Sequence, residues 1–353
     1  MSWRVRAARA ADLPALMDLA RLTGGGFTNL PADEAALAER LALSDASFAR
    51  REDAPDNELY TLLLEHTGSA GDAAAATARI GGCAMVFSRI GARWPFYSYK
   101  IGVLSQTSKA LGQTFSLPFL SLVTDHDGAS EVGGLFLHPD LRTGGPGSGG
   151  QGSGSLGRLL ARSRYLFVAQ HRARFGDRML AELRGVLDDD GNSPFWEAIG
   201  AKFFGMGFTE ADRFNSVNGN QFIADLMPKH PIYIALLPEA ARAVIGQPHP
   251  KGRPALAMLE AEGFHYDNYV DIFDGGPTVT ARTDSLRSIR DARLMPVDRL
   301  CPTGDGFARS LVATGRLAEF RAWIGRVGDA ALPAGEAALM GVAVGDEVRH
   351  VAF

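Results

Sequence analysis

Two histidines stand in strings whose residue types suit proton transfer. His249 lies between Pro248 and Pro250, and His230 precedes Pro231. A histidine with an ordinary pKa of about 6.5 exchanges its proton near neutral pH, so either residue could serve as an acid or a base. The chain has 8 histidines, and a histidine between prolines is also an ordinary surface residue. The spacing alone therefore leaves both as candidates.

A second pattern could hold a phosphate group. A strand is expected over Glu131–His138, and Arg142, Gly145 and Gly147 follow it before a helix that carries Leu159. A glycine turn before a helix offers backbone N–H groups to an anion, and the helix dipole favours the negative charge. Because the chain has 41 glycines, a flexible linker with an unrelated arginine is the alternative. The order of strand, proline, arginine, glycine turn and helix is similar to the coenzyme A cradle of GCN5-related N-acetyltransferases.

Several separate strings make the resemblance narrower. They span about residues 3 to 290 and include Thr23–Pro31, Pro95–Tyr99, Leu135–Pro139, Ser193–Trp196, Met227–Tyr233, Gly246–Pro250 and Asp271–Thr278. Through them the chain resembles the arginine N-succinyltransferase family of that superfamily. The resemblance implies a mixed α/β fold, in which helices flank a mixed sheet. It also implies an acyltransferase that takes succinyl-CoA and L-arginine, with no cofactor beyond succinyl-CoA.

The resemblance also implies roles for particular residues. It assigns the catalytic histidine of the family to His249. It assigns coenzyme A to the backbone of one strand and to the turn and helix after it, through Leu135, Phe136, Leu137, Arg142, Gly145, Gly147 and Arg158. The strand amides would stabilise the oxyanion that forms when an amine attacks the thioester.

The chain departs from the family pattern in three places. Residues 143–155 form a Gly/Ser-rich insertion, which leaves open whether Gly145 and Gly147 or Gly154 and Gly157 meet the phosphates. Gly133-Gly134 stands where the family usually has Cys-Thr, so a side-chain role there is not expected. Pro248 replaces an aliphatic residue beside the retained histidine.

Charged residues suggest how the substrates are held. Glu131 begins the strand where superfamily members often place a base, and its alternative is a solvated strand end. Asp271 and Asp274 could bind a guanidinium group or cap the Gly-Gly turn beside them. Arg184 could bind the succinyl carboxylate or form an ion pair. Thr23–Pro31 lies where the acceptor enters in the superfamily.

The composition excludes several other classes of protein. The net charge is -4 without long runs of one sign, which argues against nucleic acid or an anionic membrane as partner. The beginning of the chain lacks a signal peptide, and no apolar stretch approaches the ~20 residues of a membrane helix. Cys83 and Cys301 have no metal or redox spacing, and no metal-ligand cluster is visible. A cytoplasmic protein is therefore expected, and family members are generally homo- or hetero-oligomers.

Hydrophobic patterns predict three parts. Residues 1–210 form the acyltransferase-like core, residues 211–295 a second half that carries the histidine, and residues 296–353 a small β-rich appendage. The similar strings Ser193–Phe208 and Ala257–Phe264 each suggest a helix that ends in Gly-Phe before a strand, so a duplicated core stays open. One helix is expected over Pro194–Phe204, and separate strands over Tyr97–Leu104 and Pro118–Val123.

Three functions remain in competition at this point. The first is succinyl transfer to the α-amino group of arginine, in arginine catabolism. The second is the same chemistry on ornithine or another small amine. The third is a coenzyme A-binding structural subunit of a heteromeric acyltransferase. Kinetics of the purified chain on both amino acids would separate them.

Overall fold

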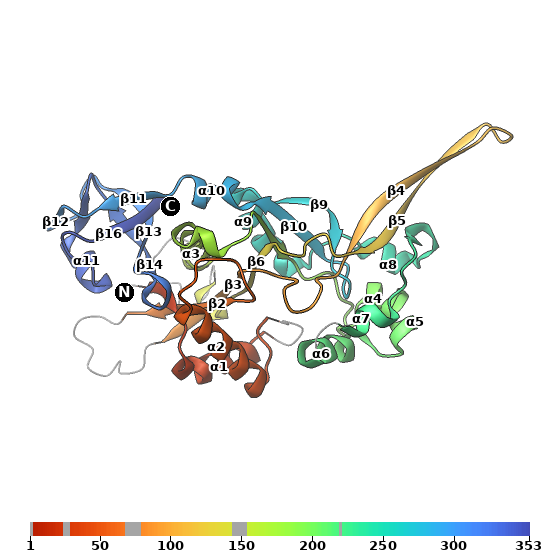
Figure 1. Cartoon of the computed structure of the whole chain (residues 1–353), viewed down its shortest axis with the longest axis horizontal. Helices are drawn as coiled ribbons and strands as arrows, with labels where there is room; N and C mark the ends of the chain where they lie inside the picture. Colours follow the sequence, from red (N-terminus) through yellow and green to blue (C-terminus); the bar gives the residue numbers. More distant parts are fainter. Residues whose placement is uncertain (1–2, 24–28, 68–78, 143–153, 219–220) are drawn as a thin grey trace. The chain divides into compact units, whose positions relative to one another are not determined.

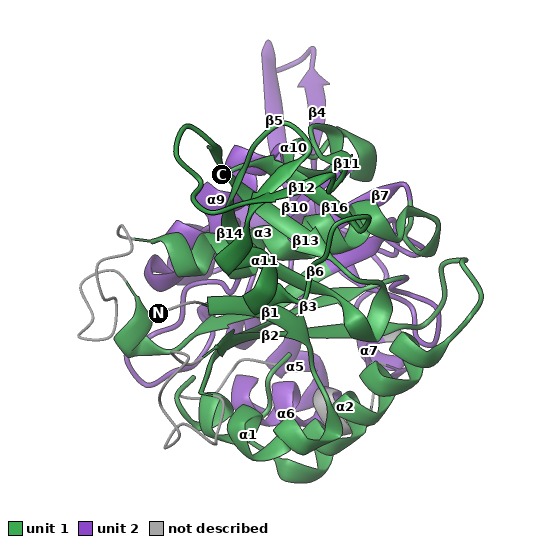
Figure 2. Ribbon diagram, turned by 90° about the vertical axis from the view of Figure 1, so that its left-hand side faces the viewer, with its two compact units in different colours: residues 1–88, 132–176, 283–353 green, residues 89–131, 177–282 purple. Residues whose placement is uncertain are grey.

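The structure is a computed structural model that describes residues 3–23, 29–67, 79–142, 154–218 and 221–353. The fold divides into two units (Figure 2). Unit 1 comprises Met1–Ser88, Val132–Gly176 and Thr283–Phe353, and unit 2 comprises Arg89–Glu131 and Asp177–Arg282. The expected boundaries after residues 210 and 295 fall inside these units, because each unit is assembled from segments that are distant in the sequence.

Unit 1 is built on a mainly antiparallel sheet. Its strands lie in the order β11, β16, β13, β14, β1, β2, β3, β6. Their bounds are β1 (Trp3–Ala7), β2 (Leu59–His66), β3 (Ile80–Phe87), β6 (Ser130–Leu137), β11 (Arg293–Pro296), β13 (Ala308–Thr314), β14 (Arg321–Val327) and β16 (Glu347–Ala352). β1 pairs with β14 through Val5 and Ala322, so the C-terminal strands extend the core sheet. The β-rich C-terminal region is thus hydrogen-bonded to the first strand of the chain.

Helices cover both faces of this sheet (Figure 1). Leu59 and Leu63 of β2 pack in one cluster with residues of α1 (Leu13–Arg21) and α2 (Glu34–Ala49). Tyr60 points to the opposite face, as strand alternation requires, and its ring lies 4.8 Å from that of Phe167 in α3 (Ser155–Gln170). The remaining regular elements of unit 1 are α10 (Arg287–Arg290), α11 (Ala334–Met340) and a small parallel sheet of β12 (Arg299–Cys301) and β15 (Ala331–Pro333).

The sheet strands of unit 2 lie in the order β7, β10, β9, β4, β5, β8. The strands are β7 (Arg178–Glu182), β10 (Pro277–Arg282), β9 (His265–Val270), β4 (Ser98–Ser108), β5 (Gln113–Val123) and β8 (Ile232–Tyr233). The first two residues of β6, Ser130 and Glu131, belong to this unit and pair in parallel with Met179 and Leu180 of β7. The mixed α/β class is therefore as expected.

Five helices of unit 2 contribute to a cluster around Trp196 and Phe195, which are fully buried. These helices are α4 (Pro194–Ala198), α5 (Gly200–Phe204), α6 (Phe208–Asn218), α7 (Gln221–Leu226) and α8 (Glu239–Val244). α9 (Arg253–Glu262) also belongs to unit 2. The single helix expected over Pro194–Phe204 is two, because Ile199 leaves the helical region with φ −122° and ψ −77°.

The two Gly-Phe strings have different continuations. Gly263, with φ +113°, ends α9 and leads into β9 as expected. Phe208 instead begins α6, so the strand expected after Gly207 is wrong. A local string of eight residues does not determine which element comes after it.

Candidate active site

His249 is held in a rigid turn of unit 2. It begins the 3-10 turn Pro250–Gly252, and its backbone N–H donates to the carbonyl of Arg184 at 2.7 Å. Its Nδ1 accepts a hydrogen bond from the backbone N–H of Lys251 at 3.1 Å. Because Nδ1 is an acceptor, the neutral imidazole carries its proton on Nε2. The side chain is half-buried, so Nε2–H is available as a donor.

The surroundings of His249 favour the neutral imidazole. Burial lowers the pKa of His249, and the positive charges of Arg184 and Lys251 lower it further. Each of these effects disfavours the imidazolium form. At neutral pH the residue is therefore a hydrogen-bond donor through Nε2.

The loop Asp271–Thr278 fixes the neighbouring backbone. The carboxylate of Asp274 accepts hydrogen bonds from the N–H groups of Gly185 and Gly276, at 2.7 and 2.8 Å. Asp271 accepts from the N–H groups of Phe273 and Asp274, at 2.7 and 2.9 Å. Both aspartates thus cap backbone turns, the second of the two roles that the sequence left open.

This loop also reaches the histidine turn. Gly246 donates its N–H to the carbonyl of Gly275 at 2.8 Å, and Pro248 forms a β-bridge with Gly185. Asp274 therefore supports His249 indirectly, because it fixes Gly185 beside Arg184. Gly275 has φ +68°, a left-handed conformation that favours glycine.

A group of carboxylates lies beside this loop. Glu131 is paired with Leu180, so Glu131 and Glu182 project from the same face of the sheet. Thr278 lies opposite Glu182 on β10, and its hydroxyl donates to the Glu182 carboxylate at 3.5 Å. Burial raises the pKa of Glu182 well above its usual range, and the charges of Asp271, Glu131 and Asp274 raise it further. A carboxylate whose pKa is raised is a stronger base than an ordinary carboxylate.

The residues expected to bind coenzyme A lie in unit 1. Leu135, Phe136 and Leu137 form the end of β6. Among the described residues, the pairing of β6 with β7 covers Ser130 and Glu131, so residues 135–137 lie beyond its end. Just before them Gly134 has φ +58°, and a Cβ there would meet the side chain of Met85 at 2.8 Å. Glycine adopts this left-handed conformation without strain.

The two expected arginines are also placed in unit 1. Arg142 donates from Nε to the carbonyl of Leu137 at 2.9 Å, and its guanidinium lies 5.1 Å from the centre of the Phe136 ring. Arg158, in the first turns of α3, lies over the ring of Phe353 at 4.5 Å. Gly145 and Gly147 are outside the described residues. Gly154 caps α3 with φ +86°.

Comparison with known proteins identifies the family. The model described as "Arginine N-succinyltransferase beta subunit" matches residues 3–288, and the model of its C-terminal domain matches residues 293–352. The chain belongs to the arginine N-succinyltransferase family. Members of this family are acyltransferases, and the expected family and enzyme class are thus confirmed.

Individual relatives agree with this assignment. The chain is 42% identical over 289 residues to arginine N-succinyltransferase subunit beta of Pseudomonas aeruginosa, covering 82% of this chain and 79% of the relative. It is 40% identical over 352 residues to arginine N-succinyltransferase of Escherichia coli O139:H28, covering 98% and 96%. The solved structure of arginine/ornithine succinyltransferase subunit AI from Pseudomonas aeruginosa matches with a TM-score of 0.85 and 33% identity, over 99% of this chain and 98% of that one.

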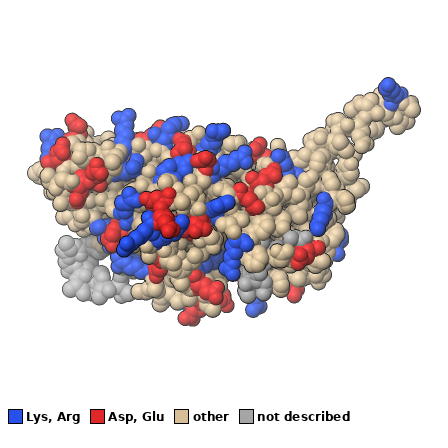
Figure 3. Space-filling model, viewed as in Figure 1, with Lys and Arg blue, Asp and Glu red and all other residues tan. Residues whose placement is uncertain are grey.

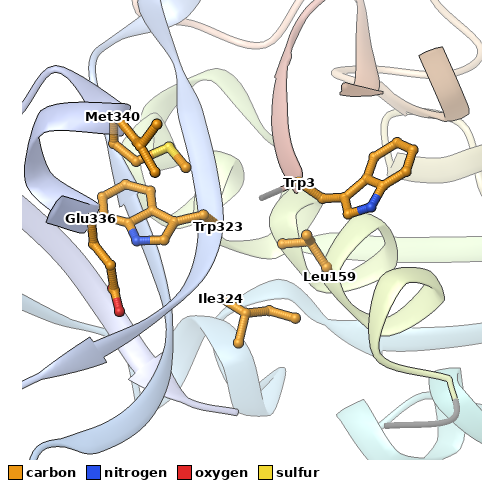
Figure 4. A pocket seen from close by; sticks show the side chains of 7 residues that line it. Trp3, Leu159, Trp323, Ile324, Glu336 and Met340 are labelled. Carbon is orange, nitrogen blue, oxygen red and sulfur yellow. The ribbon is translucent and has the colours of Figure 1, made fainter. Parts of the chain in front are cut away.

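Unit 1 has a cavity of about 210 Å³. None of the candidate site residues named above lines it, although Leu159 of α3 does. Figure 4 shows it between β1, α3 and the C-terminal strands, lined by Trp3, Leu159, Trp323, Ile324, Glu336 and Met340. No histidine is among the residues that line it. We therefore place the chemistry of this succinyltransferase family member elsewhere.

Three further findings concern metal binding, thiol chemistry and membrane helices in the described residues. No group of three or more His, Cys, Asp or Glu side chains within them is arranged to hold a metal ion. Burial raises the pKa of Cys83 to about 12, so this thiol is a poor nucleophile. No helix in the described part of the chain is long and apolar enough to cross a membrane.

Sequence reasoning missed Glu182 and Lys251. Glu182 follows the buried apolar residues Met179–Ala181 of β7, and a charged residue next to such a run is the feature that could have revealed it. No sequence pattern indicates a role for Lys251. Its importance arises from the backbone hydrogen bond that orients the imidazole.

Proposed function

We propose that this protein transfers the succinyl group of succinyl-CoA to the α-amino group of L-arginine, in the cytoplasm, as a step of arginine catabolism. The observation that carries the proposal is the grouping in unit 2 of a neutral, oriented His249 with Arg184 and the carboxylates Glu131 and Glu182. Amide formation from a thioester needs a proton acceptor for the amine and a donor for the developing negative charge.

The carboxylates provide the proton acceptor. The α-amino group of a free amino acid is largely protonated at neutral pH and must lose a proton before it can attack. Glu182 has a raised pKa, and Glu131 shares its face of the sheet. We assign the first deprotonation to Glu182, with Glu131 as the nearest alternative. Before this proton transfer, the same carboxylate can bind the positively charged α-ammonium group of the substrate.

Bond formation and cleavage then balance. The amine nitrogen forms a bond to the thioester carbonyl carbon, and the carbonyl oxygen becomes an oxyanion that backbone N–H groups can stabilise. The C–S bond breaks, and the Nε2–H of His249 stabilises the negative charge that leaves with the sulfur. The second proton of the attacking nitrogen passes to the thiolate. The products are the N-succinyl amino acid and the free thiol of coenzyme A.

Charge also suggests how the donor is recognised. The succinyl group carries a carboxylate, and Arg184 provides positive charge close to His249. Arg142 and Arg158 follow the strand that receives the thioester and are assigned to the phosphates of coenzyme A, with the glycine segment between them.

The assay follows thiol release from succinyl-CoA by a colorimetric reagent and the product by mass spectrometry. We expect the purified chain with arginine to give N2-succinylarginine. Faster turnover of acetyl-CoA than of succinyl-CoA would exclude the proposed donor. A reaction without any amine would show hydrolysis instead of transfer.

Ornithine is the second candidate acceptor, because the solved relative is named as an arginine/ornithine succinyltransferase subunit. A preference of the purified chain for ornithine would favour it. Two of the relatives are named as subunits, so we also expect a homo- or hetero-oligomer. A chain that binds succinyl-CoA but is inactive alone, and becomes active with a related chain, would be the structural subunit instead.

A further inference from the structure

A long hairpin leaves the body of unit 2. β4 and β5 pair in continuous register from Ser98–Val123 to Ser108–Gln113. Among the described residues, other strands pair with it at its base, where β9 pairs with Tyr99 and Lys100 and β8 pairs with Phe119 and Leu120. Residues 102–119, here called the arm, project from the rest of unit 2 (Figure 1). The two strands expected from sequence are the basal ends of this single hairpin.

One face of the arm is apolar. Leu104 pairs with Leu117, and Gln106 pairs with Phe115, so these side chains share a face. Leu104 and Leu117 are each 38% exposed, and Phe115 is 52% exposed. Large apolar side chains in a row on a thin ribbon have no core of their own to enter, which is typical of an interaction surface.

The other face is lined by hydroxyl groups that satisfy one another. Ser105 and Ser116 are hydrogen-bonded at 2.7 Å, and Thr107 and Thr114 at 2.9 Å. Because these hydroxyl groups are hydrogen-bonded to one another, another protein surface can cover this face with a small desolvation penalty. Pro118 removes a backbone N–H from the β5 edge, which disfavours extension of the ribbon by another strand.

The arm is almost uncharged. Lys109 is its single charged residue, and Figure 3 shows a neutral ribbon with a basic group at its end. Depletion of charged residues is characteristic of the central part of protein interfaces. A neutral arm does not select a partner of opposite charge. An isolated two-stranded hairpin is also only marginally stable in water, so a covering surface would stabilise it.

We propose that the arm packs on a second copy of this chain, in a two-fold arrangement in which each copy receives the arm of the other. The body of unit 2 offers exposed apolar side chains as a receiving surface, among them Leu236 at 81% and Leu226 at 54% exposure. An arm and receiving surface on one chain make the contact self-complementary, as two-fold symmetry requires.

The size of the arm favours a dimer in which both copies exchange their arms over a dimer held by one arm. Seven residue pairs of the arm, at about 3.4 Å per residue, give a length of about 24 Å, and two strands give a face about 10 Å wide. Both faces then cover roughly 500 Å², and one buried arm removes roughly 1,000 Å² in total, below the ~1,200–2,000 Å² of a stable interface. Two exchanged arms remove roughly 2,000 Å², which is sufficient.

Sedimentation equilibrium of the purified chain tests the proposal. We expect twice the monomer mass of 37.7 kDa at micromolar concentration. The triple variant Leu104→Ser, Phe115→Ser, Leu117→Ser should weaken self-association at least 100-fold. The matched control Leu294→Ser, Val344→Ser changes side chains of 53% and 58% exposure in unit 1 and should leave it unchanged. Equal effects of the two variants, or a monomeric unmodified chain, would overturn the proposal.

A second measurement does not depend on folding of the triple variant. A photo-crosslinking amino acid at position 115, in a mixture of ¹⁴N- and ¹⁵N-labelled copies, should yield cross-linked peptides that combine the two labels. Cross-links confined to one copy, or association only after a related chain is added, would refute the second copy as partner. Neither measurement needs a substrate, so an absence of transferase activity would not affect the result.

Discussion

His138 in unit 1 and His249 in unit 2 each begin a 3-10 turn before a proline, with φ/ψ of −51°/135° and −51°/139°. In each turn Nδ1 accepts the backbone N–H of the residue two positions later, from Asp140 at 3.2 Å and from Lys251 at 3.1 Å. The backbone N–H of each histidine donates to a carbonyl of a neighbouring segment. The local structure of the two His-Pro turns is thus nearly the same.

The two turns differ in the charges around them and in the segment that leads to the next helix. Nδ1 of His138 lies 3.6 Å from the carboxylate of Asp140, whereas the charges around His249 are those of Arg184 and Lys251. α9 begins at Arg253, directly after the second turn, whereas α3 begins only after the glycine-rich segment. One turn therefore leads to a glycine-rich helix start suited to an anion, and the other presents an imidazole among cations. The His-Pro string alone does not decide the role.

The largest effect should come from His249→Asn. Asparagine can still cap the turn, since its side-chain oxygen can accept the N–H of Lys251, but it cannot place a donor at the position of Nε2. We expect turnover to fall by about 10²–10³-fold, the usual loss for one oriented donor in an active site. Steady-state kinetics would measure it.

Two substitutions serve as controls for this prediction. His138→Asn changes the matching turn, and His230→Asn changes an exposed histidine of unit 2. Both should reduce turnover much less than His249→Asn. Equal losses at His138 and His249 would show that both turns matter only as structure, and a normal turnover of His249→Asn would remove the assignment.

The next largest effect should come from Asp274→Ala, which removes the carboxylate that supports the His249 turn. Asp274→Ala leaves the N–H groups of Gly185 and Gly276 without their acceptor, and each loss costs about 1–3 kcal/mol. We expect the free energy of unfolding to fall by about 2–6 kcal/mol in urea titrations, since two N–H groups lose their acceptor, with turnover reduced as well. Asp140→Ala removes a half-exposed carboxylate beside the first turn and should change stability little.

Arg142 tests the phosphate-binding role of unit 1. Arg142→Gln should weaken coenzyme A binding roughly tenfold in calorimetric titrations, because a hydrogen bond to a charged group contributes about 1.5 kcal/mol. Arg253→Gln removes a charge from the corresponding helix start in unit 2 and should leave the affinity unchanged. The opposite pattern would exchange the roles of the two turns.

Lys251→Met should have the smallest effect, on the pH profile alone. Burial and the charges of Arg184 and Lys251 lower the pKa of His249, so removal of one charge should raise it toward its ordinary value. In the proposed mechanism the neutral imidazole is the active form, so activity should fall as the pH drops below this pKa. The acidic limb of kcat/KM should therefore move to higher pH. As a control, Asp140→Asn should leave the acidic limb of kcat/KM at the same pH. If Lys251→Met also left this limb unchanged, the neutral imidazole of His249 would not be the active form.

Much of the fold follows from local patterns in the sequence. The strand expected over Glu131–His138, the helix that carries Leu159 and the helix that ends at Gly263 are present as β6, α3 and α9. The middle of the β4–β5 hairpin was not predicted, because its hydroxyl and apolar faces are both exposed and no core selects its pattern. The split at Ile199 was missed because Pro194–Phe204 has ordinary helical composition.

The sequence by itself determined the family strings, the positions of His249 and the β6 strand, and the types of residue available for acyl transfer. The tertiary structure decided which of them act on one another. It assigned Asp271 and Asp274 to backbone N–H groups, added Glu182 to Glu131 on one face of the sheet, and oriented the imidazole of His249 through Lys251. The physical reason is that a carboxylate or an imidazole has the same pattern in sequence whether it faces water, a charge or a backbone amide. Its pKa and its free hydrogen-bonding atoms depend on neighbours that chain folding brings from distant segments.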